Sequence, residues 1–470
     1  MRLFFPRMQL QALPGLFCLL CVFLSALPGS MASAQKINLP PVTRITFDNG
    51  IRVVLMEYHR APILSVRAVF PGGAALDGPG KAGLAALTAS LMTKGTETRT
   101  GPQIAEEIDF LGGSLSAGAG RDRFSLYLDV LARDTAAGLS LFQEALRHPT
   151  FPAEELERER QLRVAGLESL GDNPGGIANR VANETVFAGH PYGLELTVTS
   201  IGSLQRDDLI DYYHRTVAPN TMILVVVGDF RTLEMAATLK HLFSDWPKSD
   251  THPSPVPPAK ASPRRRILID KPDATQTQVR WMRVGLPRSS DDYYAAQIAN
   301  AVLGGGFTSR LIDEIRVNRS LTYGIDSSFA AQEAGGSFGV STFTKIETTR
   351  ALLDATETVL RKTAQQGVTP TELQKVKGFM VGMYAVQMQT PEALAGQLTD
   401  IEVFGLPKDY LQSYLPRLRS ITLADANRIA KTYFAPENLS VVLVGPAKKI
   451  APQLQGLGAF ETRPVETVGK

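Results

Sequence analysis

Three side chains have the spacing of a catalytic or metal-binding set, but their types carry no such chemistry. Ala86, Ala89 and Ser90 lie at i, i+3 and i+4 of a segment predicted to be helical, so they project from one face. The helix is predicted to begin after the turn at 77–80 and to end at 94–95, where a basic residue precedes a glycine. Two methyl groups and a hydroxyl cannot bind a metal ion. No two of the 6 histidines are close enough in sequence to form a helical His-x-x-x-His pair.

A second candidate set lies in the latter half of the chain. Arg316 offers a fixed fork of donors for a carbonyl or carboxylate, and Tyr323 follows it at the start of a strand predicted over 323–329. Taken singly, each residue has a simpler interpretation, because Arg complements a helix C-terminus and Tyr favours strands. The glycines at 304–306 are not a phosphate loop, since no Lys-Ser/Thr pair follows them. They are predicted to form a flexible turn or to terminate a helix.

The elements that must position these residues recur in the same order in two halves. Strands are predicted at 51–56, 64–70 and 124–130, the last two from strict alternation of apolar residues. In the second half, apolar residues at i, i+3, i+4, i+7 and i+8 from Ala295 to Leu303 indicate a helix. This pattern predicts an α+β protein with one half-buried, mainly antiparallel sheet in each domain and helices packed on it.

An internal repeat supports the division into two related domains. Each copy contains a proline, then a short apolar strand that closes at a glycine, as Pro219 to Gly228 and as Pro436 to Gly445. The predicted domains span 35–246 and 264–470. Between them, residues 247–263 are rich in proline and are predicted to form an extended, semi-rigid linker. A docking motif for a proline-binding module is the alternative for this segment.

Residues 1–34 have the pattern of a secretory signal peptide. Arg2 and Arg7 precede the apolar run 16–27, and small residues at 32–34 form a cleavage site. An uncleaved membrane anchor is the alternative, which the short apolar run disfavours. The only 2 cysteines lie within this segment, so the mature chain is predicted to have no disulfide and no thiolate ligand. Export and the absence of cysteine favour a bacterial periplasm, with no membrane contact after cleavage.

Composition narrows the class of function. Hydrophobic residues make up 44% of the chain and charged residues 20%, which is typical of a globular protein. The formal net charge of +3 falls to +1 without Arg2 and Arg7. This near-neutral balance gives no basis for binding nucleic acid or an anionic membrane.

The segment 83–96 resembles the active-site helix of the pitrilysin/insulinase-like zinc peptidases, the inverzincins. Its frame is Gly-Leu-Ala, five variable positions, then Leu-Met-x-Lys-Gly-Thr. In that family the variable positions read His-x-x-Glu-His, with two zinc ligands and the glutamate that acts on the attacking water. Here they hold Ala86, Ala89 and Ser90, and Gly166 occupies the position of the third ligand, a glutamate. Glu168 is a poor substitute, because it projects about 200° around the helix from Gly166. The resemblance therefore implies that this chain binds no metal.

The same resemblance extends to other parts of the chain. Arg316 and Tyr323 match an arginine and tyrosine pair that faces the zinc across the substrate chamber, where the tyrosine hydroxyl can donate to the oxyanion. Ser114, Leu115 and Ser116 match an edge strand on which extended peptides add as a further strand. The glycines before them are also compatible with a plain hairpin bend. The resemblance implies a two-domain clamshell unit that pairs with a second such unit.

Two functions follow as hypotheses. In the first, the chain is the non-zinc-binding subunit of a periplasmic heteromeric zinc peptidase, in which a homologous partner supplies the zinc and this chain supplies Arg316 and Tyr323 for peptide hydrolysis. Such a chain would cleave no peptide alone. In the second, it is a catalytically silent peptide-binding or structural subunit. The retained pair favours the first hypothesis, since a purely structural chain needs neither residue.

Overall fold

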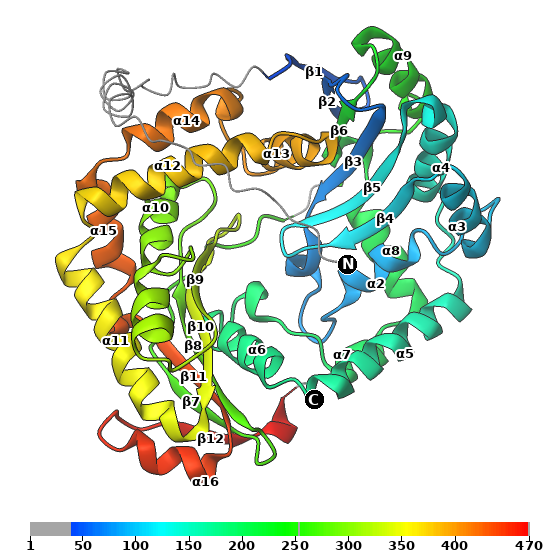
Figure 1. Ribbon diagram of the computed structural model, residues 1–470. Helices are drawn as coiled ribbons and strands as arrows, with labels where there is room; N and C mark the ends of the chain where they lie inside the picture. Colours follow the sequence, from blue (N-terminus) through cyan, green and yellow to red (C-terminus); the bar gives the residue numbers. More distant parts are fainter. Residues whose placement is uncertain (1–38, 252–253, 469–470) are drawn as a thin grey trace, which may run out of the picture. The chain divides into compact units, whose positions relative to one another are not determined.

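Two six-stranded sheets form the framework of the described residues, 39–251 and 254–468, of this computed structural model (Figure 1). The predicted signal peptide, 1–34, lies outside the described residues. The first sheet has the order β1-β2-β6-β3-β5-β4, with strands Val42–Thr46, Arg52–Glu57, Ile223–Gly228, Ile63–Pro71, Arg123–Leu131 and Ser114–Ala119. The second has the order β12-β7-β11-β8-β10-β9, with strands Glu461–Pro464, Arg266–Asp270, Ser440–Gly445, Gln276–Val284, Ser337–Lys345 and Ile325–Ala330.

The two sheets share one connectivity over five strands. In the first, β2 runs parallel to β6, and all other neighbours are antiparallel. In the second, β7 runs parallel to β11 in the same way, and β8, β10 and β9 follow antiparallel. The sixth strands differ, because β1 is antiparallel to its neighbour and β12 is parallel. The predicted α+β class with mainly antiparallel sheets is therefore correct, and the repeated glycines close the equivalent strands β6 and β11.

The helices follow the strands in each half. Those of the first half are α2 Leu84–Leu91, α3 Gly101–Phe110, α4 Thr135–Arg147, α5 Ala153–Leu170, α6 Pro174–Val186, α7 Val198–Ser203, α8 Arg206–Thr216 and α9 Thr232–Phe243. Those of the second half are α10 Tyr293–Leu303, α11 Thr349–Gln366, α12 Pro370–Val386, α13 Pro391–Val403, α14 Tyr410–Ser420, α15 Leu423–Tyr433 and α16 Ala447–Ile450. Among the residues the structure describes, no helix is long and apolar enough to cross a membrane.

Each sheet has a core on the face covered by its own helices. In the first, the predicted alternation on β3 is correct: Leu64, Val66 and Phe70 are fully buried against α2, α4 and α8 residues of one core. In the second, Ala295, Ala299 and Leu303 of the predicted α10 stripe share one core with Trp281 and Phe338 of the sheet, and the rest of the stripe is buried as well. Burial of these apolar side chains is the main favourable contribution to the fold.

The opposite face of each sheet is covered by a helix from the other half. Helix α6 packs on β8 and β11, where Ile177 and Val181 join Ile267 and Val442 in a buried cluster. Helix α13 packs in return on β3 and β6 of the first sheet. Strands β6 and β11 are consequently buried along their whole length. The half-buried sheets predicted from the sequence are therefore covered on both faces at their centres.

Polar contacts at the edges of α6 and α13 also hold these helices on the sheets of the opposite halves. Arg123 of β5 pairs with Asp400 of α13 at 2.8 Å, and Arg44 of β1 donates to Glu402 at 2.7 Å. In the other direction, Arg280 of β8 donates to Asn179 of α6 at 2.6 Å. Because both helices cross between the halves, residues 40–470 form one compact unit.

The Pro-rich segment between the sheets contacts both halves. Ser262 donates to the carbonyl of Val186 at 2.7 Å, and the amide of Ala259 donates to the carbonyl of Ala334 at 2.7 Å. His190 lies 2.7 Å from the carbonyl of Pro257 through its Nε2 atom. The described part of the segment is thus held against the fold and contains no helix or strand.

Ile177→Ala tests whether the exchanged helix couples the halves. The substitution leaves a cavity between α6 and the second sheet, so we expect a loss of about 2–5 kcal/mol in the free energy of unfolding. Urea denaturation, followed by circular dichroism, should show one cooperative transition moved to lower urea. Leu162→Ala, on an exposed position of α5, should change stability by less than about 0.5 kcal/mol. Two separate transitions, of which only one moves, would contradict the coupling.

Candidate functional site

Helix α2 is held at its N-terminus by a buried carboxylate. Asp77 accepts hydrogen bonds from the backbone amides of Gly83 and Ala85, both at 2.8 Å. Gly83 has a φ of 97°, and a Cβ atom there would lie 2.4 Å from Leu196, so glycine is required at this turn. The helix ends at Leu91, which makes the prediction of an end at 94–95 wrong. Tight turns after Leu91, with Lys94 N donating to its carbonyl, replace the last helical turn.

Burial raises the pKa of the Asp77 carboxyl group. The carboxyl group is almost fully enclosed, and this desolvation raises its pKa from 3.8 to about 6 against the opposing effect of the backbone amides. The folded protein therefore binds a proton more tightly at Asp77 than the unfolded chain does. Helix α2 consequently begins at a site whose charge changes in the weakly acidic range.

The face of α2 that carries the three small residues is covered by an arginine. Arg163 of α5 donates through Nη2 to the carbonyl of Ala86 at 3.1 Å and to Oγ of Ser90 at 2.6 Å. Ala89 is buried beneath this face. Gly166 lies one turn further along α5, with open space where its side chain would begin. The structure thus places Ala86 and Ser90 against a guanidinium group of α5, the helix that also carries Gly166.

Arg163 was not identified from the sequence. No local signal distinguishes it, because α5 contains several charged residues and its contact with α2 joins residues more than 70 positions apart. Desolvation lowers its pKa, and Glu159 opposes this effect. An arginine nevertheless stays charged at any physiological pH. A fixed positive charge therefore lies at this face of α2.

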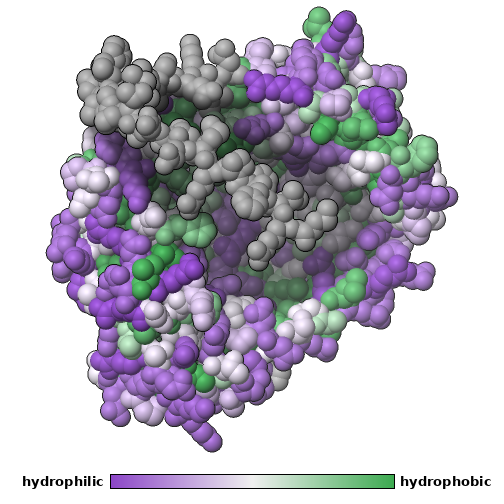
Figure 2. Space-filling model, in the orientation of Figure 1, coloured by the Kyte–Doolittle hydropathy of each residue, from purple (hydrophilic) through white to green (hydrophobic). Residues whose placement is uncertain are grey.

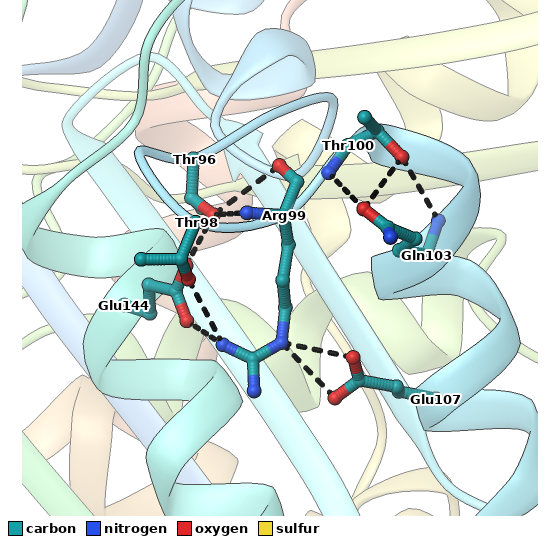
Figure 3. A network of polar contacts seen from close by, with 7 residues as sticks. All are labelled: Thr96, Thr98, Arg99, Thr100, Gln103, Glu107 and Glu144. Carbon is teal, nitrogen blue, oxygen red and sulfur yellow. Dashed lines mark hydrogen bonds and ion pairs between the residues drawn. The ribbon is translucent and has the colours of Figure 1, made fainter.

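The loop after α2 is anchored by a network of polar contacts (Figure 3). Arg99 donates through Nε to both carboxylate oxygens of Glu107 on α3, at 2.9 and 3.0 Å, and through Nη1 to Glu144 on α4. Thr100 and Gln103 form a capping box at the start of α3. These contacts fix α3, which leads directly into the edge strand β4.

Strand β4 holds the three residues predicted to bind an extended peptide. Ser114 and Ser116 are exposed, and Leu115 between them is half-buried. Within the described chain, β4 pairs only with β5, so its other edge is unpaired. Helix α2 packs against β4 as well as α5, and Ser114 and Leu115 line one pocket with Glu155 and Arg158 of α5. The peptide-binding role of these three residues stays a prediction.

Arg316 and Tyr323 lie in the second half, close to β9. Arg316 is exposed on a π-helical turn, Ile312–Asn318, and Tyr323 is 83% exposed. Strand β9 begins at Ile325, so the prediction that Tyr323 opens the strand is wrong by two residues. Glu314, the carboxylate nearest in sequence, accepts hydrogen bonds from Arg319 and Asn318 instead. Within the described ranges, the side chains of Arg316 and Tyr323 have no hydrogen bond or ion pair, so both are available to a ligand.

The glycines at 304–306 both terminate a helix and line a cavity. The carbonyl of Asn300 accepts the amides of Gly304 and Gly305, which ends α10. Asn300 also exchanges two hydrogen bonds with Ser327 of β9. The cavity beside them measures about 630 Å³ and is lined in part by Phe307 and by Phe379 of α12. On the face shown in Figure 2, hydrophobic side chains form separate patches among hydrophilic ones.

The residues at the predicted metal positions do not fit zinc. Zinc sites use histidine, cysteine and carboxylate ligands, and Ala86, Ser90 and Gly166 supply none of these. The part of the chain that the structure describes contains no group of three or more such side chains arranged to hold a metal ion. Arg163 adds a positive charge at the same face, which would repel a metal cation.

Comparison with known proteins agrees with this architecture. Residues 52–200 match the insulinase model of peptidase family M16, and residues 203–379 match the model described as the peptidase M16 inactive domain. The chain belongs to the insulinase family, peptidase family M16.

Relatives in this family carry different descriptions. An uncharacterised zinc protease of Mycobacterium leprae is 26% identical over 88% of this chain and 94% of its own length. The non-peptidase homolog YmxG of Helicobacter pylori is 23% identical over 92% of this chain and 99% of its own. A crystal structure of a peptidase M16 inactive domain from Pseudomonas fluorescens has a TM-score of 0.81, with 26% identity, 86% of this chain covered and 98% of that chain.

Stability should depend on pH through Asp77. Because its pKa is raised on folding, the wild-type protein should lose up to about 3 kcal/mol of unfolding free energy from this group as pH rises from about 4 to 6. Asp77→Asn removes the titration, so the difference between variant and wild type should change across this range. Asp109→Asn, on the exposed side of α3, is the control. A constant difference between wild type and Asp77→Asn in urea titrations at each pH would contradict the assignment.

Reintroducing a ligand set tests the effect of Arg163 on metal binding. We expect Ala86→His, Ser90→His and Gly166→Glu together to bind zinc at least about tenfold more weakly with Arg163 present than with Arg163→Ala. Like charges about 4 Å apart repel by several kcal/mol near a protein surface, which is the physical reason. Zinc affinity is measured by competition with a chelator, and Arg158→Ala, on an exposed position of the same helix, is the control. Equal affinities in both backgrounds would contradict the expectation.

Proposed function

We propose that this chain is the non-zinc-binding subunit of a heteromeric zinc peptidase of the bacterial periplasm. A homologous partner with an intact His-x-x-Glu-His helix supplies the metal, and this chain supplies Arg316 and Tyr323. The observation that carries the proposal is the exposure of both residues without a hydrogen bond or ion pair among the described residues. The first half meanwhile holds an arginine where the family's catalytic members bind zinc. The predicted signal peptide supports the compartment.

Each residue has a distinct role in the proposal. The hydroxyl of Tyr323 donates to the oxyanion that forms as water attacks the scissile carbonyl. Arg316 binds a carbonyl or carboxylate of the peptide through its planar fork. These roles differ in their kinetic consequences, because an oxyanion contact strengthens in the transition state and an anchoring contact is made already in the ground state.

A catalytically silent peptide-binding subunit is the second candidate. The unpaired edge of β4 supports it, because an extended peptide can add to such an edge without any chemistry. The description of the Helicobacter pylori relative as a non-peptidase homolog points the same way. The two candidates differ in whether Tyr323 acts on turnover.

Tyr323→Phe separates the two candidates. In a mixed complex with a His-x-x-Glu-His homologue, we expect kcat to fall about a hundredfold with little change in KM, since one oxyanion donor is lost. The ring and its packing remain, so association measured by size-exclusion chromatography should not change. Normal assembly with wild-type turnover would leave this chain a scaffold.

Arg316→Ala should act on binding. We expect KM to rise about tenfold or more with a smaller effect on kcat, because an anchoring interaction is removed equally from ground and transition states. Arg319→Ala is the matched control, since Arg319 is three residues away but already paired with Glu314. Steady-state kinetics with one peptide substrate measures both variants. An equal loss in the control would assign the effect to the π-helical turn rather than to Arg316.

A further inference from the structure

Arg163 is a positive charge with unused hydrogen-bonding capacity. Nη2 makes both hydrogen bonds to α2, and Nε is buried without a partner. A guanidinium group has five N–H donors, so donors on Nε and Nη1 remain. Arg310 provides a contrast, because its Nε and Nη2 both donate to Glu372 at 2.7 Å. Nη1 of Arg163 is therefore the nitrogen that can still donate to a further acceptor, because Nη2 is used by α2 and Nε is buried.

No carboxylate of the described chain neutralises Arg163. It forms no ion pair there, and Glu159, the acid that acts on it electrostatically, lies 3.9 Å from Nζ of Lys94. Ser90 is next to the last residue of α2, so the partial negative charge of the helix C-terminus offsets part of the charge. A desolvated cation without a counter-ion is costly, and an anion bound beside it would reduce that cost.

The neighbouring strand indicates which anion can reach Arg163. Helix α2 contacts both α5 and β4, and the outer edge of β4 is unpaired in the described chain. Ser114 and Leu115 of β4 line one pocket with Glu155 and Arg158 of α5, so an extended peptide that adds to β4 passes close to the helix that carries Arg163. One uncompensated positive charge also matches a singly charged carboxylate better than a doubly charged phosphate. A hydrogen bond from Nη1 to a carboxylate is charge-assisted and is therefore stronger than one to a neutral acceptor.

We propose that Arg163 binds a carboxylate of an extended peptide that pairs with β4. The proposal rests on the peptide-binding role of β4 and specifies the class of ligand: a peptide that carries its negative charge at the C-terminus or on an Asp or Glu side chain. Binding of this peptide requires neither a partner subunit nor catalytic turnover.

Calorimetry on the wild-type chain alone tests the proposal with three ten-residue peptides of Ser, Thr, Leu and Lys. One has a free C-terminus, one is amidated, and one is amidated with a single internal Glu. We expect a carboxylate-bearing peptide to bind about ten- to a hundredfold more tightly than the amidated peptide without Glu, as for hydrogen bonds to charged groups. Preference for the free acid alone identifies the C-terminus, and preference for the Glu peptide identifies a side chain.

Variants assign that preference to Arg163. Arg163→Gln can keep hydrogen bonds to Ala86 and Ser90 but should bind all three peptides equally, whereas Arg163→Lys should retain part of the preference. Arg231→Gln, exposed at the start of α9 and away from β4, should behave as wild type. Equal binding of all three peptides by wild type, no binding at millimolar peptide, or a preference that survives Arg163→Gln would overturn the proposal. Because the wild-type comparison needs no variant, misfolding of Arg163→Gln cannot obscure it, and the kinetics of Tyr323→Phe play no part.

Discussion

Each half contributes one helix that packs on the sheet of the other half, and the rest of the structure depends on this packing. Helix α6 covers a face of the second sheet, and α13 covers the matching face of the first. Without these helices, the central strands β6 and β11 would expose continuous apolar faces to water, at a cost proportional to their area. Each sheet therefore depends on a helix from the other half to bury one of its faces. This packing also gives the residues on the two halves a fixed framework, which a shared site requires.

The two halves use the same strand connectivity for different purposes. In the first, α2 and α5 bring a guanidinium group against a helix face that has no ligand for a metal. In the second, the equivalent region ends a helix at 304–306, opens a cavity, and presents an arginine and a tyrosine to solvent. A duplicated fold can diverge in this way because each copy keeps its own buried core, whereas a few side chains at the edges decide the chemistry.

The helix face that lacks the zinc ligands carries the positive charge of Arg163. Loss of the ligands would by itself leave a neutral surface of small residues. The structure instead contains a positive charge at that surface, held by a carbonyl and a hydroxyl and left without an acidic partner among the described residues. A cation that is fixed, desolvated and unpaired is suited to binding an anion rather than to activating water. This charge, together with the missing ligands, separates this face from the zinc site of the family's catalytic members.

The sequence by itself determined the family, the α+β class, the repeat that ends at Gly228 and Gly445, and the alternation that buries one face of β3, because each depends on residues close together in the chain. Tertiary structure decided what depends on distant residues. Local patterns predicted half-buried sheets, since they do not show that a helix from the other half covers the second face. They also extended α2 to 94–95 and began β9 at Tyr323, because tight turns replace regular structure there. Arg163 could not be predicted, because its environment is created only when α5 packs against α2.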